Sequence, residues 1–265
     1  MKAACQTLVT RLRPLAAKLL GQFLDADPLT SHVRFAEGSA FSELKPELRI
    51  PFTDVAMKAY LDRVSLSATG YYATPGLSWN RATGTGRPFH YFANGAAVTE
   101  VAVDKFTGMM EVLRADILQD CGDSINVGVN RGQVEGGFVQ GLGWLTMEEL
   151  KWDDKGRLLT HSPDTYKIPA AGDRPRVFNV RFLERATQPD VIHGSKAVGE
   201  PPLMLAISVR EAIRDAVAAF GAPGGMIALA SPATSEAIFM SVQERLRRPW
   251  PEEPTTRRRR RTASA

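Results

Sequence analysis

The segment Gly132-Gln133-Val134-Glu135-Gly136-Gly137-Phe138-Val139-Gln140-Gly141-Leu142-Gly143 decides how the middle of the chain folds. Its pattern predicts a helix from about residue 132 to residue 150, with Asn130 as the N-cap. Each glycine costs about 1 kcal/mol in a helix interior relative to alanine. Such a glycine content is expected where the helix backbone approaches another backbone, or a ligand, closely. Gln133 and Gln140 offer amides to a polar cofactor, and tight helix packing through small residues is the other explanation.

Strand patterns flank this helix on both sides. Residues 96–104 and 110–117 alternate in polarity around a turn and predict a hairpin of two long strands. Residues 177–183 predict a further strand, and residues 152–159 a second short hairpin. The turn-rich stretch 70–88 predicts an irregular loop, because glycines and prolines interrupt every period.

Apolar residues at spacings of three and four predict the remaining helices. These helices are expected at residues 1–24 with a kink or break at Pro14, at 52–64 with Thr53 or Asp54 as the cap, at 203–220, and at 235–247. The predicted fold class is therefore α+β, with a mixed sheet of hairpins packed against helices.

A glutamate between a glycine and two prolines is a candidate for chemistry. Glu200 follows Gly199, and Pro201 pushes the backbone of Glu200 towards an extended conformation. Pro202 suits the first turn of the helix that follows. A carboxylate on such a stiff loop is a candidate general base. The alternative is a carboxylate that caps the helix or faces solvent.

Composition excludes several classes of protein. The chain has 265 residues and a net charge of +4, but residues 257–261 are five consecutive arginines, so the rest of the chain is nearly neutral. A solvated tail explains these arginines better than nucleic-acid binding does. No apolar run approaches the about 18 residues that a membrane helix needs. Two cysteines and four scattered histidines argue against a thiolate or histidine metal cluster. The acid-free N-terminal helix is consistent with a transit peptide, and an ordinary packed helix is the favoured interpretation.

Three segments resemble, in order and spacing, the molybdenum subunit of the xanthine dehydrogenase family. They are residues 132–143, 166–170 (Tyr-Lys-Ile-Pro-Ala) and 195–203, and residues 4–7, 70–79 and 86–89 add earlier matches. The resemblance covers about residues 3–220. It implies the C-terminal part of the second molybdopterin-binding domain of that family. Aldehyde-oxidising relatives share the Glu200 loop, and the matches at 70–79 and 87–89 favour the xanthine branch.

The resemblance implies oxidative hydroxylation of hypoxanthine and xanthine to urate at a molybdenum-molybdopterin centre. Glu200, in Gly-Glu-Pro-Pro, matches the catalytic base, and Gln133 matches a glutamine that hydrogen-bonds the cofactor. Ser195, Lys196 and Val198 match the loop around the metal. The pterin dithiolene holds the molybdenum, so no side chain is expected as a metal ligand. Electrons are expected to pass to Fe-S clusters and FAD on a partner subunit, and then to NAD.

The chain departs from the family in sequence and in length. Val127, Asn130 and Arg131 replace the family's usual residues beside the glycine-rich segment. We expect a C-terminal fragment, with residues 1–222 forming an incomplete molybdopterin-binding domain and 223–265 a short helix and a basic disordered tail. The expected partners are the upstream part of the molybdenum subunit, which carries the purine-clamping residues, and the Fe-S/FAD subunit. No membrane or nucleic-acid partner is expected.

The expected location is cytoplasmic, and the isolated chain is expected to be inactive. The alternative is a non-catalytic remnant, or a subunit-interaction module, that retains the fold.

Overall fold

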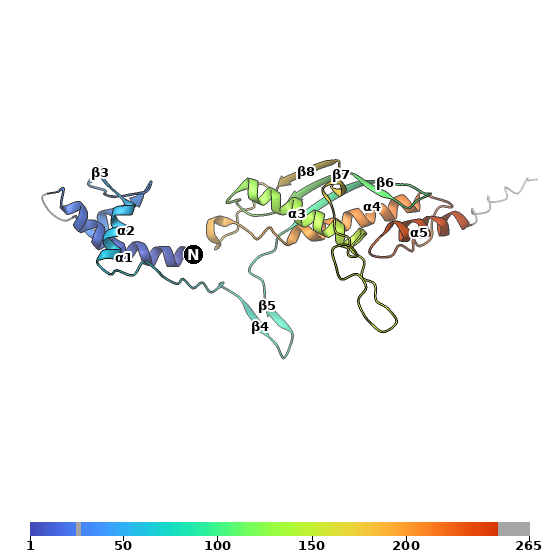
Figure 1. Cartoon of the computed structure of the whole chain (residues 1–265), viewed down its shortest axis with the longest axis horizontal. Helices are drawn as coiled ribbons and strands as arrows, with labels where there is room; N and C mark the ends of the chain where they lie inside the picture. Colours follow the sequence, from blue (N-terminus) through green and yellow to red (C-terminus); the bar gives the residue numbers. More distant parts are fainter. Residues whose placement is uncertain (25–27, 249–265) are drawn as a thin grey trace, which may run out of the picture. The chain divides into compact units, whose positions relative to one another are not determined.

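The structure is a computed structural model that describes residues 1–24 and 28–248 (Figure 1). The chain divides into two compact units, Met1–His90 and Tyr91–Ala265. The arginine run at residues 257–261 lies outside the described residues.

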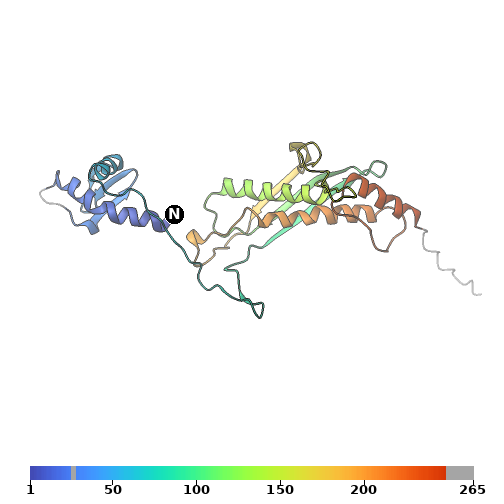
Figure 2. The ribbon, with the colours of Figure 1, turned by 60° about the horizontal axis from the view of Figure 1, so that its bottom comes forward.

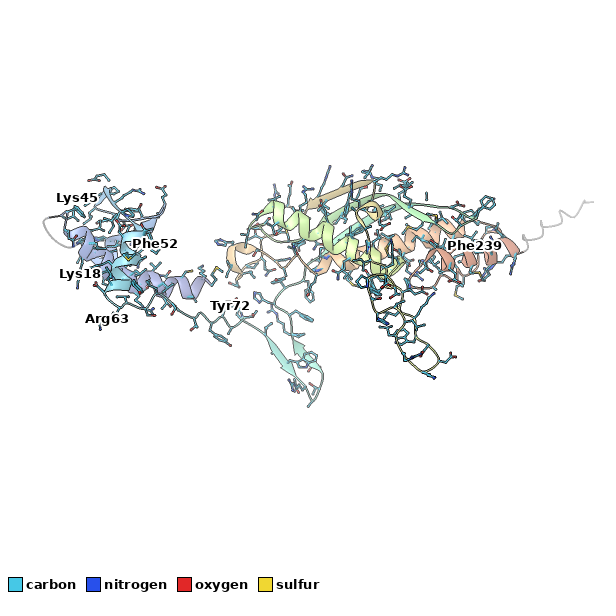
Figure 3. The ribbon with its side chains drawn as sticks, viewed as in Figure 1. Lys18, Lys45, Phe52, Arg63, Tyr72 and Phe239 are labelled. Carbon is cyan, nitrogen blue, oxygen red and sulfur yellow. The ribbon has the colours of Figure 1, made fainter. Side chains whose placement is uncertain are left out.

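The first unit packs two helices against a small antiparallel sheet of order β1-β2-β3. Its elements are α1 (Lys2–Gly21), η1 (Thr30–His32), β1 (Val33–Ala36), β2 (Ser39–Ser42), β3 (Lys45–Pro51) and α2 (Phe52–Leu61). Phe52 packs edge to face on Phe35 of β1, with ring centroids 5.8 Å apart (Figure 3). The fully buried side chains include Ala16, Leu20 and Val55.

Two expectations for this unit are wrong: a break of the first helix at Pro14, and a side-chain cap for the second helix. Helix α1 continues through Pro14 without a break. Pro14 lies on the exposed side of α1, while the side formed by Leu12, Ala16 and Leu20 is buried, so packing holds the helix together across the proline. Helix α2 begins directly after Pro51, and no side chain caps it.

The stretch predicted as an irregular loop contains a short hairpin, β4 (Ser78–Asn80) and β5 (Thr85–Arg87). Gly86 has φ +151° and a Cβ there would collide with the carbonyl oxygen of Ser78, so only glycine fits this pairing. Tyr72, just before the hairpin, is 63% exposed (Figure 3).

The second unit is a three-stranded sheet with helices on one face. The strands β6 (Gly95–Val103) and β7 (Met110–Gln119) form the predicted hairpin, and β8 (Val177–Phe182) pairs with β7 in parallel. Helices α3 (Val127–Thr146) and α4 (Ile207–Ala218) run side by side against this sheet, and α5 (Ser235–Arg247) packs on α4 (Figure 2). The α+β fold class is confirmed.

The core of this unit lies between the sheet and the helices. Val112, Ala115 and Val180 face it from the strands, and Phe138 and Ile213 face it from α3 and α4. The turn between β6 and β7 also contacts α5, because a Cβ on Gly108 would lie 2.8 Å from the amide nitrogen of Phe239 (Figure 3).

Helix α3 begins earlier than the sequence pattern predicts. Asn126 is the N-cap, and its Oδ1 accepts a hydrogen bond of 3.0 Å from the Val129 amide. Asn130 instead lies in the first turns and donates to Ser124 Oγ at 2.9 Å. Both asparagines are good caps, so tertiary context decides between them.

Three short 3-10 helices and two isolated β-bridges, Gly122 with Ser195 and Trp152 with Leu158, complete the described part of this unit. The helices are η2 (Ala171–Asp173), η3 (Ile192–Gly194) and η4 (Pro201–Ala206), and the predicted hairpin at 152–159 reduces to the bridge between Trp152 and Leu158. Helix α4 therefore begins only after η4, later than the predicted start at 203.

Candidate functional site

One side of helix α3 lies directly against the segment that carries Glu200. A Cβ on Gly137 would lie 3.1 Å from the carbonyl oxygen of Gly199 and 3.2 Å from Pro202 Cβ. A Cβ on Gly141 would collide with the carbonyl oxygen of Leu203. Close backbone approach therefore explains these two glycines, as predicted.

Other glycines of the same helix have no such explanation. Gly132 and Gly136 would meet nothing within 4 Å if they carried a Cβ, and both are exposed. They leave the helix surface beside Gln133 without side chains, next to a cavity that Val139, Pro169 and Phe178 also line.

Gln133 and the Glu200 loop meet at the N-terminal half of α3. A Cβ on Gly199 would lie 3.1 Å from Gln133 Oε1, so the loop passes beside the amide. The side chains of Gln133 and Glu200 are both exposed. Within the described part of the chain, the Glu200 carboxylate makes no hydrogen bond or ion pair. The fold therefore brings an uncommitted carboxylate and an amide to one surface.

The backbone of Glu200 is not extended, contrary to the sequence-based expectation. Its φ is −94° and its ψ −39°, and its carbonyl oxygen accepts a 3.1 Å hydrogen bond from the Leu203 amide. Packing of Gly199, Pro202 and Leu203 on the glycine side of α3 outweighs the local steric preference before a proline.

The three other predicted cofactor residues make contacts inside the protein. Ser195 Oγ donates to the Ile192 carbonyl at 2.8 Å, and Val198 packs against the core. Lys196 Nζ donates to Asp120 Oδ2 at 2.5 Å and to the Phe92 carbonyl at 2.9 Å. None of these contacts tests a cofactor role, which stays a prediction.

Asp120 is a residue that the sequence analysis did not single out. Its side chain is nearly buried, and its Oδ1 accepts from the Gly122 amide at 3.0 Å. Burial raises the pKa of Asp120, but the hydrogen bond from Lys196, the bond from the Gly122 amide and the charge of Lys196 together hold that pKa below its ordinary value. The only sequence signal was its position at the end of an alternating strand.

The described residues form neither a metal-binding cluster nor a membrane-spanning helix. Residues 1–24 and 28–248 hold no group of three or more His, Cys, Asp or Glu side chains arranged to bind a metal ion. Among these residues, none of the helices has the length and apolar character required to cross a lipid bilayer.

The sequence matches the model of a protein family described as the molybdopterin cofactor-binding domain, over residues 1–175. The chain belongs to this family. It is 44% identical over 240 residues to rat xanthine dehydrogenase/oxidase, a match that covers 89% of this chain and 16% of the rat protein. It is 50% identical over 188 residues to the mouse xanthine dehydrogenase/oxidase, covering 69% of this chain and 14% of that protein. The predicted family is confirmed.

Solved structures of two enzymes share the fold. Quinoline 2-oxidoreductase from Pseudomonas putida 86 matches with a TM-score of 0.59 and 29% identity, over 91% of this chain and 28% of that one. CO dehydrogenase from Oligotropha carboxidovorans matches with a TM-score of 0.64 and 21% identity, again over 91% and 28%. The chain thus spans only a minor part of the relatives that it matches.

Proposed function

We propose that this chain forms the part of a purine-hydroxylating molybdenum enzyme that supplies the general base Glu200. The reaction is the oxidative hydroxylation of hypoxanthine and xanthine to urate. The observation that carries the proposal is the meeting of Gln133 with the Gly199-Glu200 turn on one exposed surface. The family membership and the xanthine dehydrogenase relatives support the choice of reaction.

The residues at this surface fit a molybdopterin cofactor. Gly199 leaves a space beside Gln133 Oε1 that a Cβ would fill, and Gly132 and Gly136 keep the neighbouring helix surface open. Gln133 offers both a donor and an acceptor to the polar edges of a pterin. The bound molybdenum centre would supply the redox chemistry, taking up the two electrons released when a purine C–H becomes C–OH with oxygen from water.

The residues of the chain itself would orient the reactants and move a proton. Glu200 would accept the proton of the attacking oxygen nucleophile on its carboxylate, which described residues leave free for the purpose. Gln133 would hydrogen-bond the cofactor and fix its distance from Glu200. The contacts of Gly137 and Gly141 dock the segment that carries Glu200 onto α3, which carries Gln133, as accurate positioning requires.

Other parts of the enzyme would come from outside the chain. The chain covers 16% of the rat relative, so the residues that clamp the purine are assigned to the upstream part of the molybdenum subunit. Fe-S clusters and FAD are assigned to a partner subunit that carries electrons to NAD. We expect the isolated chain to be inactive for this reason.

A chimera tests this proposal. The chain would replace the matching segment of rat xanthine dehydrogenase/oxidase, and urate formation and molybdenum content would be measured. We expect activity in the chimera, and a loss of at least about 10²-fold in kcat for Glu200→Gln at unchanged molybdenum content, the low end of what a positioned base contributes.

The matched control is Glu184→Gln, which neutralises an exposed carboxylate after β8 and should leave kcat unchanged. Full activity in Glu200→Gln would refute the role of Glu200. A chimera that binds molybdenum but forms no urate even with Glu200 intact would favour a non-catalytic remnant.

A further inference from the structure

Lys196 points its charge into the protein. Its side chain is 10% exposed, and its ammonium donates to Asp120 Oδ2 at 2.5 Å and to the Phe92 carbonyl at 2.9 Å. An ammonium has three N–H donors, so these two partners occupy most of its capacity. The contacts available to Lys196 therefore lie on the side of β7 and the start of β6.

Asp120 is equally committed to this pair. It lies directly after β7, its side chain is 3% exposed, and its two oxygens accept from Lys196 and from the Gly122 amide. Gln119 Nε2 donates to the Asp120 carbonyl at 3.0 Å, which fixes the backbone at the same place. The pair is thus buried, hydrogen-bonded and attached to the end of a central strand.

Backbone contacts attach the same loop on both sides of Lys196. The Lys196 amide donates to the Cys121 carbonyl at 2.8 Å, and the Asp123 amide donates to the Gly194 carbonyl at 2.9 Å. A Cβ on Gly122 would collide with the Gly194 carbonyl. The two segments of the chain are therefore as close here as glycine permits.

The attachment continues one residue towards Glu200. The Ala197 amide donates to the Tyr91 hydroxyl at 2.8 Å. After that residue only Val198 and Gly199 separate the attached loop from Glu200, and Val198 packs on the core. The ion pair therefore fixes the chain just before the proposed base.

We propose that Asp120 and Lys196 are positioning residues that set the place of Glu200 relative to Gln133, and that Lys196 does not contact the cofactor. This inference rests on the proposed function of Glu200. It differs from the sequence-based expectation, in which Lys196 belongs to the cofactor's own surroundings. The two roles predict different effects of removing the ammonium.

Hydrogen exchange on the full 265-residue chain tests the attachment without any cofactor. In Lys196→Met we expect the hydrogen-bonded amides of residues 194–197 to exchange at least about tenfold faster, while those of α5 change by less than about twofold. Lys196→Arg should restore part of the protection, because a guanidinium can still reach Asp120. Lys167→Met, at an exposed lysine, is the control.

A second variant keeps the test decisive if Lys196→Met unfolds. The double variant Asp120→Asn/Lys196→Met removes both charges, so no unpaired buried charge remains. Faster exchange at residues 194–197 without a change in α5 supports the proposal, and unchanged exchange at 194–197 overturns it.

The chimera with rat xanthine dehydrogenase/oxidase separates positioning from cofactor contact. We expect Lys196→Met to lower kcat by about 10- to 100-fold, as displacement of a catalytic group does, with KM and molybdenum content nearly unchanged and partial rescue by Lys196→Arg. A fall in molybdenum content would overturn the positioning role. If Glu200→Gln were fully active, the proposed function would fail, whereas the exchange result on the isolated chain would stand.

Discussion

Two buried cations in the described part of the second unit are held in different ways. Lys196 faces a carboxylate, Asp120, beside the candidate site. Arg245, on α5, is 2% exposed and faces only backbone carbonyls. Its guanidinium donates to the carbonyl oxygens of Ala218, Phe220, Ala222 and Gly224. Arg245 thus holds the turns after α4 through carbonyl groups, which do not titrate. Lys196 holds the loop before the proposed base through a carboxylate, which does titrate.

The largest expected effect is the loss of the Arg245 contacts. Arg245→Met should lower the free energy of unfolding by about 4 kcal/mol, because several charge-assisted hydrogen bonds are lost and buried carbonyls are left unsatisfied. Denaturant unfolding of the full chain measures this difference. Arg247→Met, at an exposed position of the same helix, should change stability by less than about 0.5 kcal/mol. If the two substitutions lowered the free energy of unfolding equally, the contacts of buried Arg245 would have no special role in stability.

Lys196→Met should cost about 3 kcal/mol, because it leaves the Asp120 carboxylate buried without its partner. The double variant Asp120→Asn/Lys196→Met should cost clearly less, since no charge remains to be desolvated. The same unfolding experiment gives both values as a mutant cycle. A double variant that is less stable than Lys196→Met would show that the pair is not coupled through charge.

Two glycines of α3 allow a second comparison, between a glycine packed against the segment that carries Glu200 and a glycine that faces open space. Gly141→Ala should destabilise by about 2 kcal/mol, because the new Cβ would lie 2.8 Å from Ala206 Cβ in a filled region. Gly136→Ala should stabilise by about 1 kcal/mol, because nothing lies within 4 Å and alanine is the better helix former. Thermal or denaturant melts measure both, and effects of the same sign would contradict the assigned contacts.

The smallest effect is the pH dependence that the Asp120 carboxylate adds to stability, to which the carbonyl partners of Arg245 have no counterpart. The folded pKa of Asp120 is depressed, so its contribution to stability is present above its unfolded pKa of about 4 and is lost as pH falls through the folded pKa. Below pH about 4 the unfolding free energy of the wild type should fall more steeply with pH than that of Asp120→Asn. The difference in slope is at most that of one titrating proton. Unfolding free energies between pH 6 and 3, a range set about that pKa, test this. Parallel pH profiles would contradict it.

Local patterns predicted the elements well and their partners poorly. The last helix has the predicted bounds, Ser235–Arg247, and the hairpin of β6 and β7 follows from alternating polarity. The parallel pairing of β8 with β7 could not be predicted, because strand periodicity carries no information on direction.

For the candidate site too, the sequence indicated individual residues but not which of them meet in the fold. Glu200 and Gln133 were singled out as candidates from their local sequence, and the resemblance suggested their roles. Their meeting depends on how Gly137 and Gly141 admit the loop. Asp120 was missed because an aspartate at a strand end is ordinary in sequence. Its importance comes from Lys196, which is distant in the chain and adjacent only in the fold.

The parallel pairing of β8 also has a consequence for the order of folding. The hairpin of β6 and β7 closes a short loop, whereas the register that pairs Arg114 with Val177 spans all of α3. Closing a long loop costs more chain entropy, so we expect the hairpin to form first and β8 to join later. The segment that carries Glu200 follows β8 and docks on the loop directly after β7 and on α3. The proposed base would then reach its place only after the sheet is complete, and a chain stalled before that step would be compact without being competent.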